Sequence, residues 1–347
     1  MTLDDLISRR GGWLEDADEG PVISSRIRLA RNLRDTTMPG CASKKIRNRV
    51  WNEVVSAFDS IPENKTFMRW RMDELSALDR DLLFERHLIS RDLAEGAAGA
   101  GVFVNENECV SVMVNEEDHL RLQSLQPGLN LKTAWEIADR MDDELEKNLT
   151  YAFSSKLGYL TACPSNVGTG LRASVMLHLP GLVLTGEIKP VVNAVSKIGL
   201  AVRGLWGENS ESSGHMFQIS NQMTLGKPEA EIIAHLEQIV LEVIEHEKNA
   251  RARLMEKSLR VPDHVQRAYG IMSYAILMST NEALDLLSAL RMGTDLKLLP
   301  ALDRRELARY FIRVQPAHLQ KIAGATLTPE ERDFKRAEIV REFLGKK

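Results

Sequence analysis

Residues 163–175, with the sequence CPSNVGTGLRASV, hold more chemically useful side chains than any other segment of this 347-residue chain. They combine the Cys163 thiol, several hydroxyl groups, two glycines and the guanidinium of Arg172. Glycine allows a positive φ or a close approach to a ligand, and the forked guanidinium suits phosphate oxygens. Backbone N–H groups beside a cation favour the binding of an anion. From composition alone, a glycine-rich turn between two core elements is an equally good explanation.

Three other segments place arginine or glutamate at short spacing: SSRIRLAR at 24–31, NEEDHLR at 115–121 and RGLWGE at 203–208. Together with the cysteine segment, and in the same order, they resemble the signature motifs of the guanidino (phosphagen) kinases. Within that family the chain is most similar to the bacterial protein-arginine kinase (McsB type) branch. Its first arginine pair lies close to the start, which implies that the helical N-terminal domain of the small-molecule members is missing. Its RDFKRA sequence at 332–337 resembles the RDxxRA phosphoarginine-binding element of that branch.

Phosphoryl transfer from ATP requires cations along the triphosphate and strict alignment of the reacting atoms. The sequence contains no GxxxxGK[ST] loop and no HRD or DFG set, which excludes a P-loop or a protein-kinase site. The resemblance assigns the phosphates to arginines inside the motifs: Arg26, Arg28, Arg121, Arg172 and Arg203. It also implies nucleotide contacts for Ser25 and for His87, the latter beside the adenine. A lone arginine is more often a solvated surface charge, but five at matching positions favour a site.

The acceptor must be made nucleophilic, because a guanidinium almost never loses its proton in proteins. Carboxylates can pair with the guanidinium fork and accept its proton as the bond forms. The resemblance places Glu117 and Glu208 at these two positions, and Glu117 is the better candidate for the base. If the preceding strand continued through this segment, Glu116 would point to the opposite face. Without the other motifs, a solvent-facing acidic turn would be the default interpretation.

Cys163 has two interpretations. Most isolated cytosolic cysteines behave as buried small hydrophobic residues, whereas cationic surroundings can stabilise a reactive thiolate. The family resemblance favours the second, with a thiolate that orients the guanidinium and forms no covalent intermediate. ATP implies Mg²⁺, which we expect to be held by phosphates and water because the sequence shows no all-protein metal cage.

The pattern of elements predicts an α+β protein. We expect a phosphagen-kinase-like catalytic domain at 1–225, with an antiparallel sheet flanked by helices, and an all-helical domain at 226–347. Four elements are predicted from periodicity: an antiparallel hairpin of 101–104 and 110–114, a helix at 133–148, a strand at 216–225 and a helix at 229–259. The last helix could pack on either domain. Further helices follow, broken near Gly293, Pro300, Pro316 and Gly324.

The RDxxRA element is predicted to lie on a helix. Thr328 followed by proline and two glutamates is a typical helix start, which puts Arg332 and Arg336 four residues apart on one face. The resemblance implies that both arginines hold the phosphate of phosphoarginine while Asp333 pairs with the guanidinium of the ligand. A salt-bridged, solvated helix is the alternative.

Composition limits the remaining functions. A net charge of −4 argues against a generally basic nucleic-acid binder. No stretch approaches the ~20 apolar residues of a membrane span, and the N-terminus lacks the apolar core of a signal peptide. Three scattered cysteines without CxxC spacing suit a reducing cytosol, so we expect a cytoplasmic protein.

The leading hypothesis is a kinase that converts ATP and protein arginine to ADP and protein phosphoarginine. The resemblance further implies marking of proteins for a Clp-type AAA+ protease in stress response, an activator or adaptor protein as partner, and a homo-oligomer. One alternative is a kinase for free arginine or another small guanidine, against which the missing domain argues. Another is a non-catalytic adaptor that binds phosphoarginine, against which the set of Glu117, Cys163 and Glu208 argues. Trp206 departs from the basic residue that small-molecule members often carry there.

Overall fold

A single large sheet organises the protein. The computed structural model describes residues 3–15, 20–96, 98–204, 213–257, 259–299 and 302–345. Its main sheet has eight strands, all antiparallel to their neighbours, in the order β2-β3-β4-β5-β1-β8-β10-β9. The strands are β1 (Val22–Arg31), β2 (Met68–Arg71), β3 (Gly101–Val104), β4 (Val110–Val114), β5 (Leu120–Pro127), β8 (Leu171–His178), β9 (Leu200–Gly204) and β10 (Met216–Asn221).

The predicted hairpin is confirmed as β3 and β4. The predicted strand at 216–225 is shorter, because β10 ends at Asn221 and the chain then turns across the cysteine segment. A separate small hairpin consists of β6 (Phe153–Ser154) and β7 (Gly158–Tyr159).

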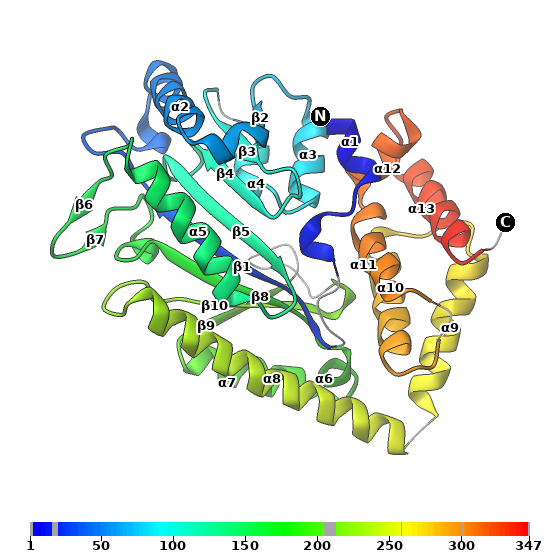
Figure 1. Ribbon diagram of the computed structural model, residues 1–347. Helices are drawn as coiled ribbons and strands as arrows, with labels where there is room; N and C mark the ends of the chain where they lie inside the picture. Colours follow the sequence, from blue (N-terminus) through cyan, green and yellow to red (C-terminus); the bar gives the residue numbers. More distant parts are fainter. Residues whose placement is uncertain are drawn as a thin grey trace.

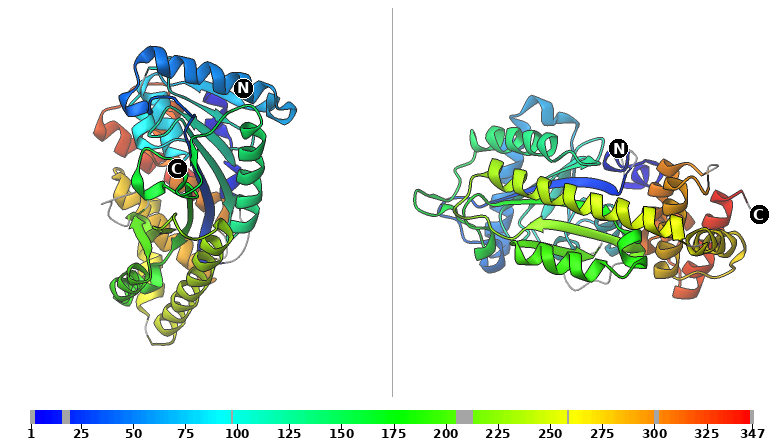
Figure 2. Two further views of the ribbon diagram at one scale, coloured as in Figure 1. Left: turned by 90° about the vertical axis from the view of Figure 1, so that its left-hand side faces the viewer. Right: turned by 90° about the horizontal axis from the view of Figure 1, so that it is seen from below.

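Helices cover one face of this sheet. They are α2 (Lys44–Asp59), α5 (Leu131–Glu146), α6 (Pro180–Leu184), α7 (Ile188–Lys197) and α8 (Glu229–Lys257). Alternate residues of β1, such as Ile27 and Leu29, join Ala138 of α5 and Leu236 of α8 in the largest buried core. In Figure 1, α5 and α8 run in front of the strands, and the left view of Figure 2 places α5 on the side opposite the C-terminal helices.

Other helices cover the two ends of the opposite face. At one end, α1 (Leu3–Ser8), α3 (Ala77–Glu85) and α4 (Arg91–Ala94) pack on β3 and β4 around Val102 and Met113. At the other, a helical core reaches Met176 and Met216 of the sheet. That core is built from α9 (Arg260–Tyr274), α10 (Thr280–Asp295), α11 (Arg304–Arg313), α12 (Pro316–Ala323) and α13 (Pro329–Phe343). Polar side chains of the central strands lie between the two covers.

The long helix α8 packs on the sheet. Its apolar residues Ile232, Leu236 and Val240 lie in the same core as β1. We therefore propose that the boundary between the two domains lies near residue 258 and not at 226.

The C-terminal helices follow most of the predicted signals. Pro316 starts α12 and Gly324 ends it with a φ of 66°. A capping box between Thr328 and Glu331 starts α13 as predicted. Near Gly293, α10 ends as predicted, at Asp295. Gly293 itself packs closely against α9, since a Cβ there would lie 2.4 Å from Val265. Pro300 lies outside the described residues.

Candidate active site

Five arginines converge on the face of the sheet opposite α5 and α8. Side chains alternate along β1, so Arg26 and Arg28 share this face while Ile27 and Leu29 enter the core behind it. The strand register sets Arg28 directly opposite Arg172 of β8, and Ala30 opposite Arg121 of β5. We call the set the arginine face; its members are Arg26, Arg28, Arg121, Arg172 and Arg203. Like charges directly opposite one another destabilise a strand pair, so folding alone does not favour this arrangement.

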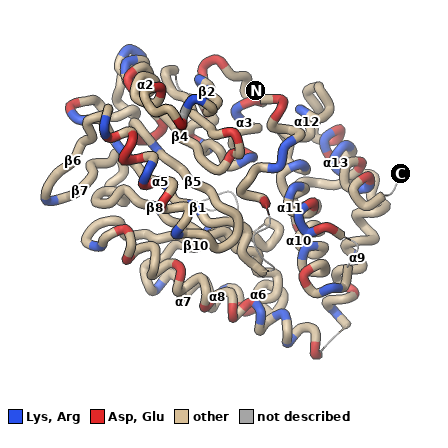
Figure 3. Tube along the Cα trace, viewed as in Figure 1, with Lys and Arg blue, Asp and Glu red and all other residues tan. Residues whose placement is uncertain are grey.

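The arginine face is electrostatically strained. Burial, followed by repulsion from Arg172, Arg121 and Arg203, lowers the pKa of Arg26 to about 10. Burial and the same kind of repulsion lower the pKa of Arg28 well below its ordinary value. The Arg28 Nε atom has no hydrogen-bond partner among the described residues. By contrast, acidic and basic positions are interspersed along α8 and the C-terminal helices (Figure 3). A crowded group of cations with lowered pKa values is typical of an anion-binding site.

A pocket of about 350 Å³ opens on this face. Four members of the arginine face line it, together with Glu117, Cys163 and the side chains of Asp92, Ser165 and Asn166. The structure therefore brings a carboxylate and a thiol beside the cations, as the motifs predict. Asp92 could not be predicted, because a lone aspartate in a short helix forms no recognisable sequence pattern.

Glu117 is held by the arginine face itself. Residues 115–119 are a series of bends that begins with Asn115 at a φ of 56°, so the strand does not continue. Arg121 bonds both glutamates, Glu116 at 2.6 Å and Glu117 at 2.8 Å. The expectation that Glu116 points to the opposite face is therefore wrong. Its buried carboxylate also accepts a hydrogen bond from Ser90.

The pKa of Glu117 is raised. Burial is the main cause, Asp118 and Glu116 contribute in the same direction, and Arg121 opposes them. A carboxylate with a raised pKa is a better proton acceptor at neutral pH. Glu117 is thus suited to deprotonating an acceptor bound in this pocket.

Cys163 is half-buried at the start of its loop, and its Sγ atom lies 3.0 Å from the Ser165 hydroxyl. A donated hydrogen bond from this hydroxyl would stabilise a thiolate. The glycines of the loop serve packing: Gly168 has a φ of 112°, and a Cβ there would lie 2.3 Å from the Thr224 carbonyl oxygen. Glu208 and Trp206 lie outside the described residues.

A second cavity contains Arg26, the member of the arginine face that does not line the pocket. Arg26 donates to Gln218 at 2.6 Å and to Ser174 at 3.4 Å. The remaining wall is largely apolar and comes from distant parts of the chain, including Trp13, Met176, Phe311 and Ile312. Its free volume is only about 50 Å³, room for a few waters, so a ligand the size of a base fits only if the walls move apart.

His87 lies in this second cavity, edge-on to Trp13 with 5.2 Å between ring centroids. Burial, with a smaller contribution from Arg26, lowers the pKa of His87 to about 3, so the ring is neutral at physiological pH. The expectation for Ser25 needs correction. Its hydroxyl donates to the Gly128 carbonyl and accepts from the Asn130 N–H on the helix-covered side, whereas Ser24 lines the cavity.

The RDxxRA residues lie on α13 but do not form a pair of surface arginines. Arg336 is buried, donates to the carbonyls of Val314 and Met278, and pairs with Asp333 at 2.5 Å. Arg332 is partly exposed and donates to the Leu327 carbonyl. The difference arises because Arg336 lies one turn further along α13 than Arg332, next to Ala337, which is part of the helical core.

Two absences concern the described part of the chain. There, no group of three or more His, Cys, Asp or Glu side chains is placed to hold a metal ion. The described helices also include none that is long and apolar enough to cross a membrane.

Comparison with known proteins identifies the family. The C-terminal catalytic domain of the ATP:guanido phosphotransferases matches residues 49–250, and the C-terminal domain of the protein-arginine kinase McsB matches residues 257–347. The chain belongs to the ATP:guanido phosphotransferase family. This phosphotransferase is 48% identical to a protein-arginine kinase of Halothermothrix orenii over 352 aligned positions, covering 99% of this chain and 100% of the relative. A protein-arginine kinase of Moorella thermoacetica is 47% identical, covering 98% and 99%.

Solved structures of the family share the fold of this phosphotransferase. A lombricine kinase superposes with a TM-score of 0.60 at 28% identity, covering 74% of this chain and 72% of its own. A duplicated taurocyamine kinase from Schistosoma mansoni gives 0.58 at 31% identity, covering 65% and 33%. The antiparallel sheet flanked by helices is therefore the expected phosphagen-kinase fold, with a helical C-terminal region in addition.

Proposed function

We propose that this phosphotransferase transfers the γ-phosphoryl group of ATP to arginine side chains of proteins. The pocket in which Glu117 and Cys163 lie beside the arginine face carries the proposal. Cations are available for a triphosphate, and a carboxylate and a thiol are available for a guanidinium. The relatives that match over nearly the full chain are named protein-arginine kinases, which supports a protein acceptor.

The triphosphate would lie along the arginine face. Arg28 lines the pocket, and Arg26, two residues earlier on the same side of β1, lines the second cavity, so the adenine would occupy the second cavity beside His87 and Ser24. A neutral, buried imidazole can contact a base without repelling it. Because this cavity is nearly closed, we expect Trp13 and Phe311 to move apart when ATP binds.

The acceptor guanidinium would lie between Glu117 and Cys163. Glu117 would leave Arg121 for the acceptor, align its fork and take its proton as the nitrogen attacks. A Cys163 thiolate, stabilised by Ser165, would orient the same group. We assign Glu208 the second carboxylate position, as the motif implies.

ATP would bring Mg²⁺. The described carboxylates of the pocket, Asp92 and Glu117, do not form a cage. The ion would be held mainly by phosphate oxygens and water, where it neutralises phosphate charge.

The C-terminal domain would bind phosphoarginine near Arg332 and Asp333, which reach the surface of α13. Its family match supports this role. We further propose that the phosphoarginine product marks proteins for a Clp-type AAA+ protease in the cytoplasm during stress, with an activator or adaptor as partner and self-association of the kinase.

The experiment is direct. The purified protein is incubated with ATP and Mg²⁺ and either an arginine-containing protein or free arginine, and acid-labile phosphate is measured. We expect phosphate on the protein. Labelling of free arginine alone would assign the chain to the small-guanidine kinases, and no labelling of either would favour a phosphoarginine-binding adaptor.

A further inference from the structure

Exposed apolar side chains gather next to the loop that carries Cys163. Two come from the β6–β7 hairpin and two from the segment after β10, with exposed fractions of 54%, 47%, 57% and 51%. We call them the apolar rim: Phe153, Leu157, Met223 and Leu225. In the described residues before α9, the other exposed large hydrophobic residues are Leu184, Ile198, Leu241, Met255 and Leu259. Four of these nine residues therefore lie on two short segments, a concentration that scattered surface residues do not show.

The segment after β10 is fastened to the Cys163 loop. Thr224 is buried, and its hydroxyl donates to the carbonyls of Ser165 and Val167 at 2.9 and 2.7 Å. Its own carbonyl accepts the Thr169 N–H at 2.9 Å. Met223 and Leu225 flank this anchor on either side, so their positions are fixed relative to the thiol.

The β6–β7 hairpin is fastened to the same loop. Tyr159 bonds Gly168 backbone to backbone, its N–H donating at 2.8 Å. The Arg31 guanidinium lies 3.5 Å from the centre of the Tyr159 ring. The Phe153 ring lies edge-on to the Tyr159 ring, with 5.3 Å between ring centroids. A Cβ at Gly158 would lie 2.4 Å from the Gly168 carbonyl oxygen, which shows how closely the two segments meet.

An arginine bound between Glu117 and Cys163 leaves its own backbone outside the pocket, and both segments that carry the rim are bonded to the loop that lines this pocket. In an extended chain, side chains two positions apart point to the same side. The residues two before and two after such an arginine would therefore face the rim. A second copy of this chain covering the rim would instead obstruct the pocket that the acceptor must enter.

We infer that the apolar rim binds apolar side chains at the −2 and +2 positions of the target arginine in an extended segment of a protein substrate. This inference rests on the proposed protein-arginine kinase activity. It makes the rim a selector among arginines: those with apolar neighbours are phosphorylated in preference to those in polar sequence.

The test compares three peptides of equal length and charge, each with one arginine. The first has Leu at −2 and +2, the second has Ser there, and the third has Leu at −1 and +1 with Ser at −2 and +2. Acid-labile phosphate gives kcat and KM for each. We expect kcat/KM for the first peptide to exceed that for the other two by about 10-fold, mainly through KM, as burial of two leucine side chains allows.

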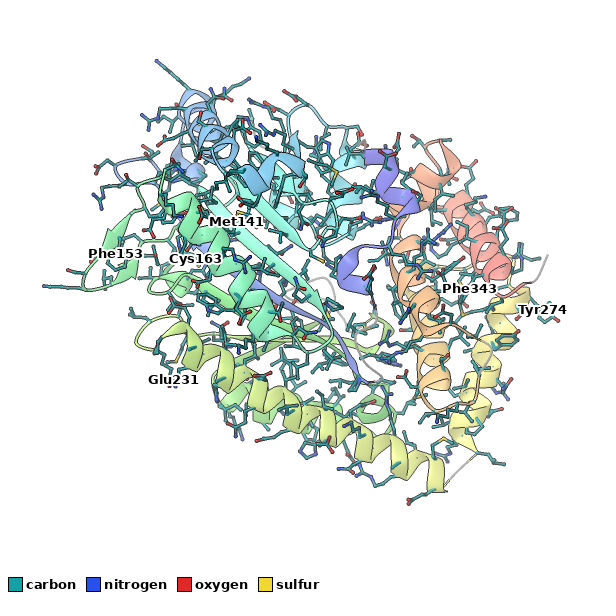
Figure 4. The ribbon with its side chains drawn as sticks, in the orientation of Figure 1. Met141, Phe153, Cys163, Glu231, Tyr274 and Phe343 are labelled. Carbon is teal, nitrogen blue, oxygen red and sulfur yellow. The ribbon has the colours of Figure 1, made fainter. Side chains whose placement is uncertain are left out.

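Two double variants alter the rim from either side: Met223→Ser with Leu225→Ser, and Phe153→Ser with Leu157→Ser. Each should bring the kcat/KM ratio of the first two peptides towards one. Tyr274→Ser is the matched control, because Tyr274 is 76% exposed and lies on the far side of the molecule from Cys163 and Phe153 (Figure 4). Its ratio should equal that of the unaltered protein.

Several results would overturn the inference. Equal kcat/KM for all three peptides in the unaltered protein would be compatible with the kinase activity but would show that the apolar rim does not select substrates. Equal preference for Leu at −1 and +1 would remove the extended geometry. A rim variant that loses concentration-dependent self-association but keeps peptide selectivity would assign the rim to a second copy of the chain. Phosphorylation of free arginine but of no peptide would remove the proposed function and the inference together.

Discussion

The arginine face and the RDxxRA helix use the same side chain in opposite ways. On the arginine face, Arg28 lies opposite another arginine, and its Nε atom lacks a partner among the described residues. On α13, Arg336 is buried and is bonded to two backbone carbonyls and to Asp333. A buried cation without sufficient partners destabilises the fold until an anion arrives, whereas a fully bonded one stabilises it. The supply of partners, and not the residue type, distinguishes a ligand site from a structural element.

The largest effect on this comparison is expected from Glu117→Gln. Removing the carboxylate should lower turnover by about 10²–10⁴-fold, because the acceptor loses its base. ATP binding should persist, since the change leaves the arginine face with one negative charge fewer to compete with phosphate. Single-turnover rates and nucleotide titration measure the two effects. Glu95→Gln, an exposed residue just after α4, is the control; turnover near that of the control in Glu117→Gln would remove Glu117 from the mechanism.

The comparison itself is tested by replacing one arginine in each region with methionine. Arg28→Met should reduce kcat/KM for ATP by on the order of 10² yet stabilise the ligand-free protein by about 1 kcal/mol, because a disfavoured charge is removed. Arg336→Met should destabilise it by about 2–4 kcal/mol, since two buried carbonyls lose their donor. Urea denaturation without nucleotide measures both. Changes of the same sign would show that the two regions do not differ as described.

Cysteine offers the same contrast on a smaller scale. Burial raises the pKa of Cys109 to about 12, so its thiol is unreactive at neutral pH. Cys163 lies open to the pocket beside Ser165. In a Cys41→Ser background, which removes the exposed thiol, iodoacetamide should inactivate the enzyme through Cys163, and ATP with substrate should protect it. Cys163→Ala should lower turnover by about 30-fold. If iodoacetamide inactivates the enzyme but peptide mass analysis finds no modification of Cys163, this assignment is refuted.

Glu116→Gln is the next smaller test. The buried carboxylate of Glu116 holds Arg121 and accepts from Ser90 and from the Glu117 N–H. It therefore positions both a phosphate ligand and the base, and its loss should lower kcat by about 10-fold. The pH profile of kcat should also move to lower pH, because Glu116 is one of the groups that raise the pKa of Glu117. An unchanged profile would limit Glu116 to a structural role.

The motifs predicted the pocket well and its surroundings poorly. The order of the four motifs was enough to bring together four arginines, Glu117 and Cys163. The alternation of side chains along β1 could have predicted Ser24 instead of Ser25 as the nucleotide contact, because Ser24 lies on the same face as Arg26 and Arg28. The cavity between Trp13 and Phe311 could not be predicted, since it joins segments that are distant along the chain. Helical periodicity predicted that Arg332 and Arg336 lie on one side of α13, but it could not predict that Arg336 is buried there.

The smallest expected effect concerns Arg332. Arg336→Ala is a poor probe of phosphoarginine binding, because it would also break the bonds that hold α13 to the helical core. Arg332→Ala loses only its hydrogen bond to the Leu327 carbonyl among those described for its side chain. If Arg332 binds the phosphate, its loss should weaken the affinity for free phosphoarginine by about 5-fold, as expected for one charge-assisted bond. Lys335→Ala, on the same helix and paired with Glu338, is the control. Calorimetric titration of phosphoarginine decides: equal affinities in Arg332→Ala and the control would make α13 a structural helix, and would extend to Arg332 the contrast already drawn for Arg336.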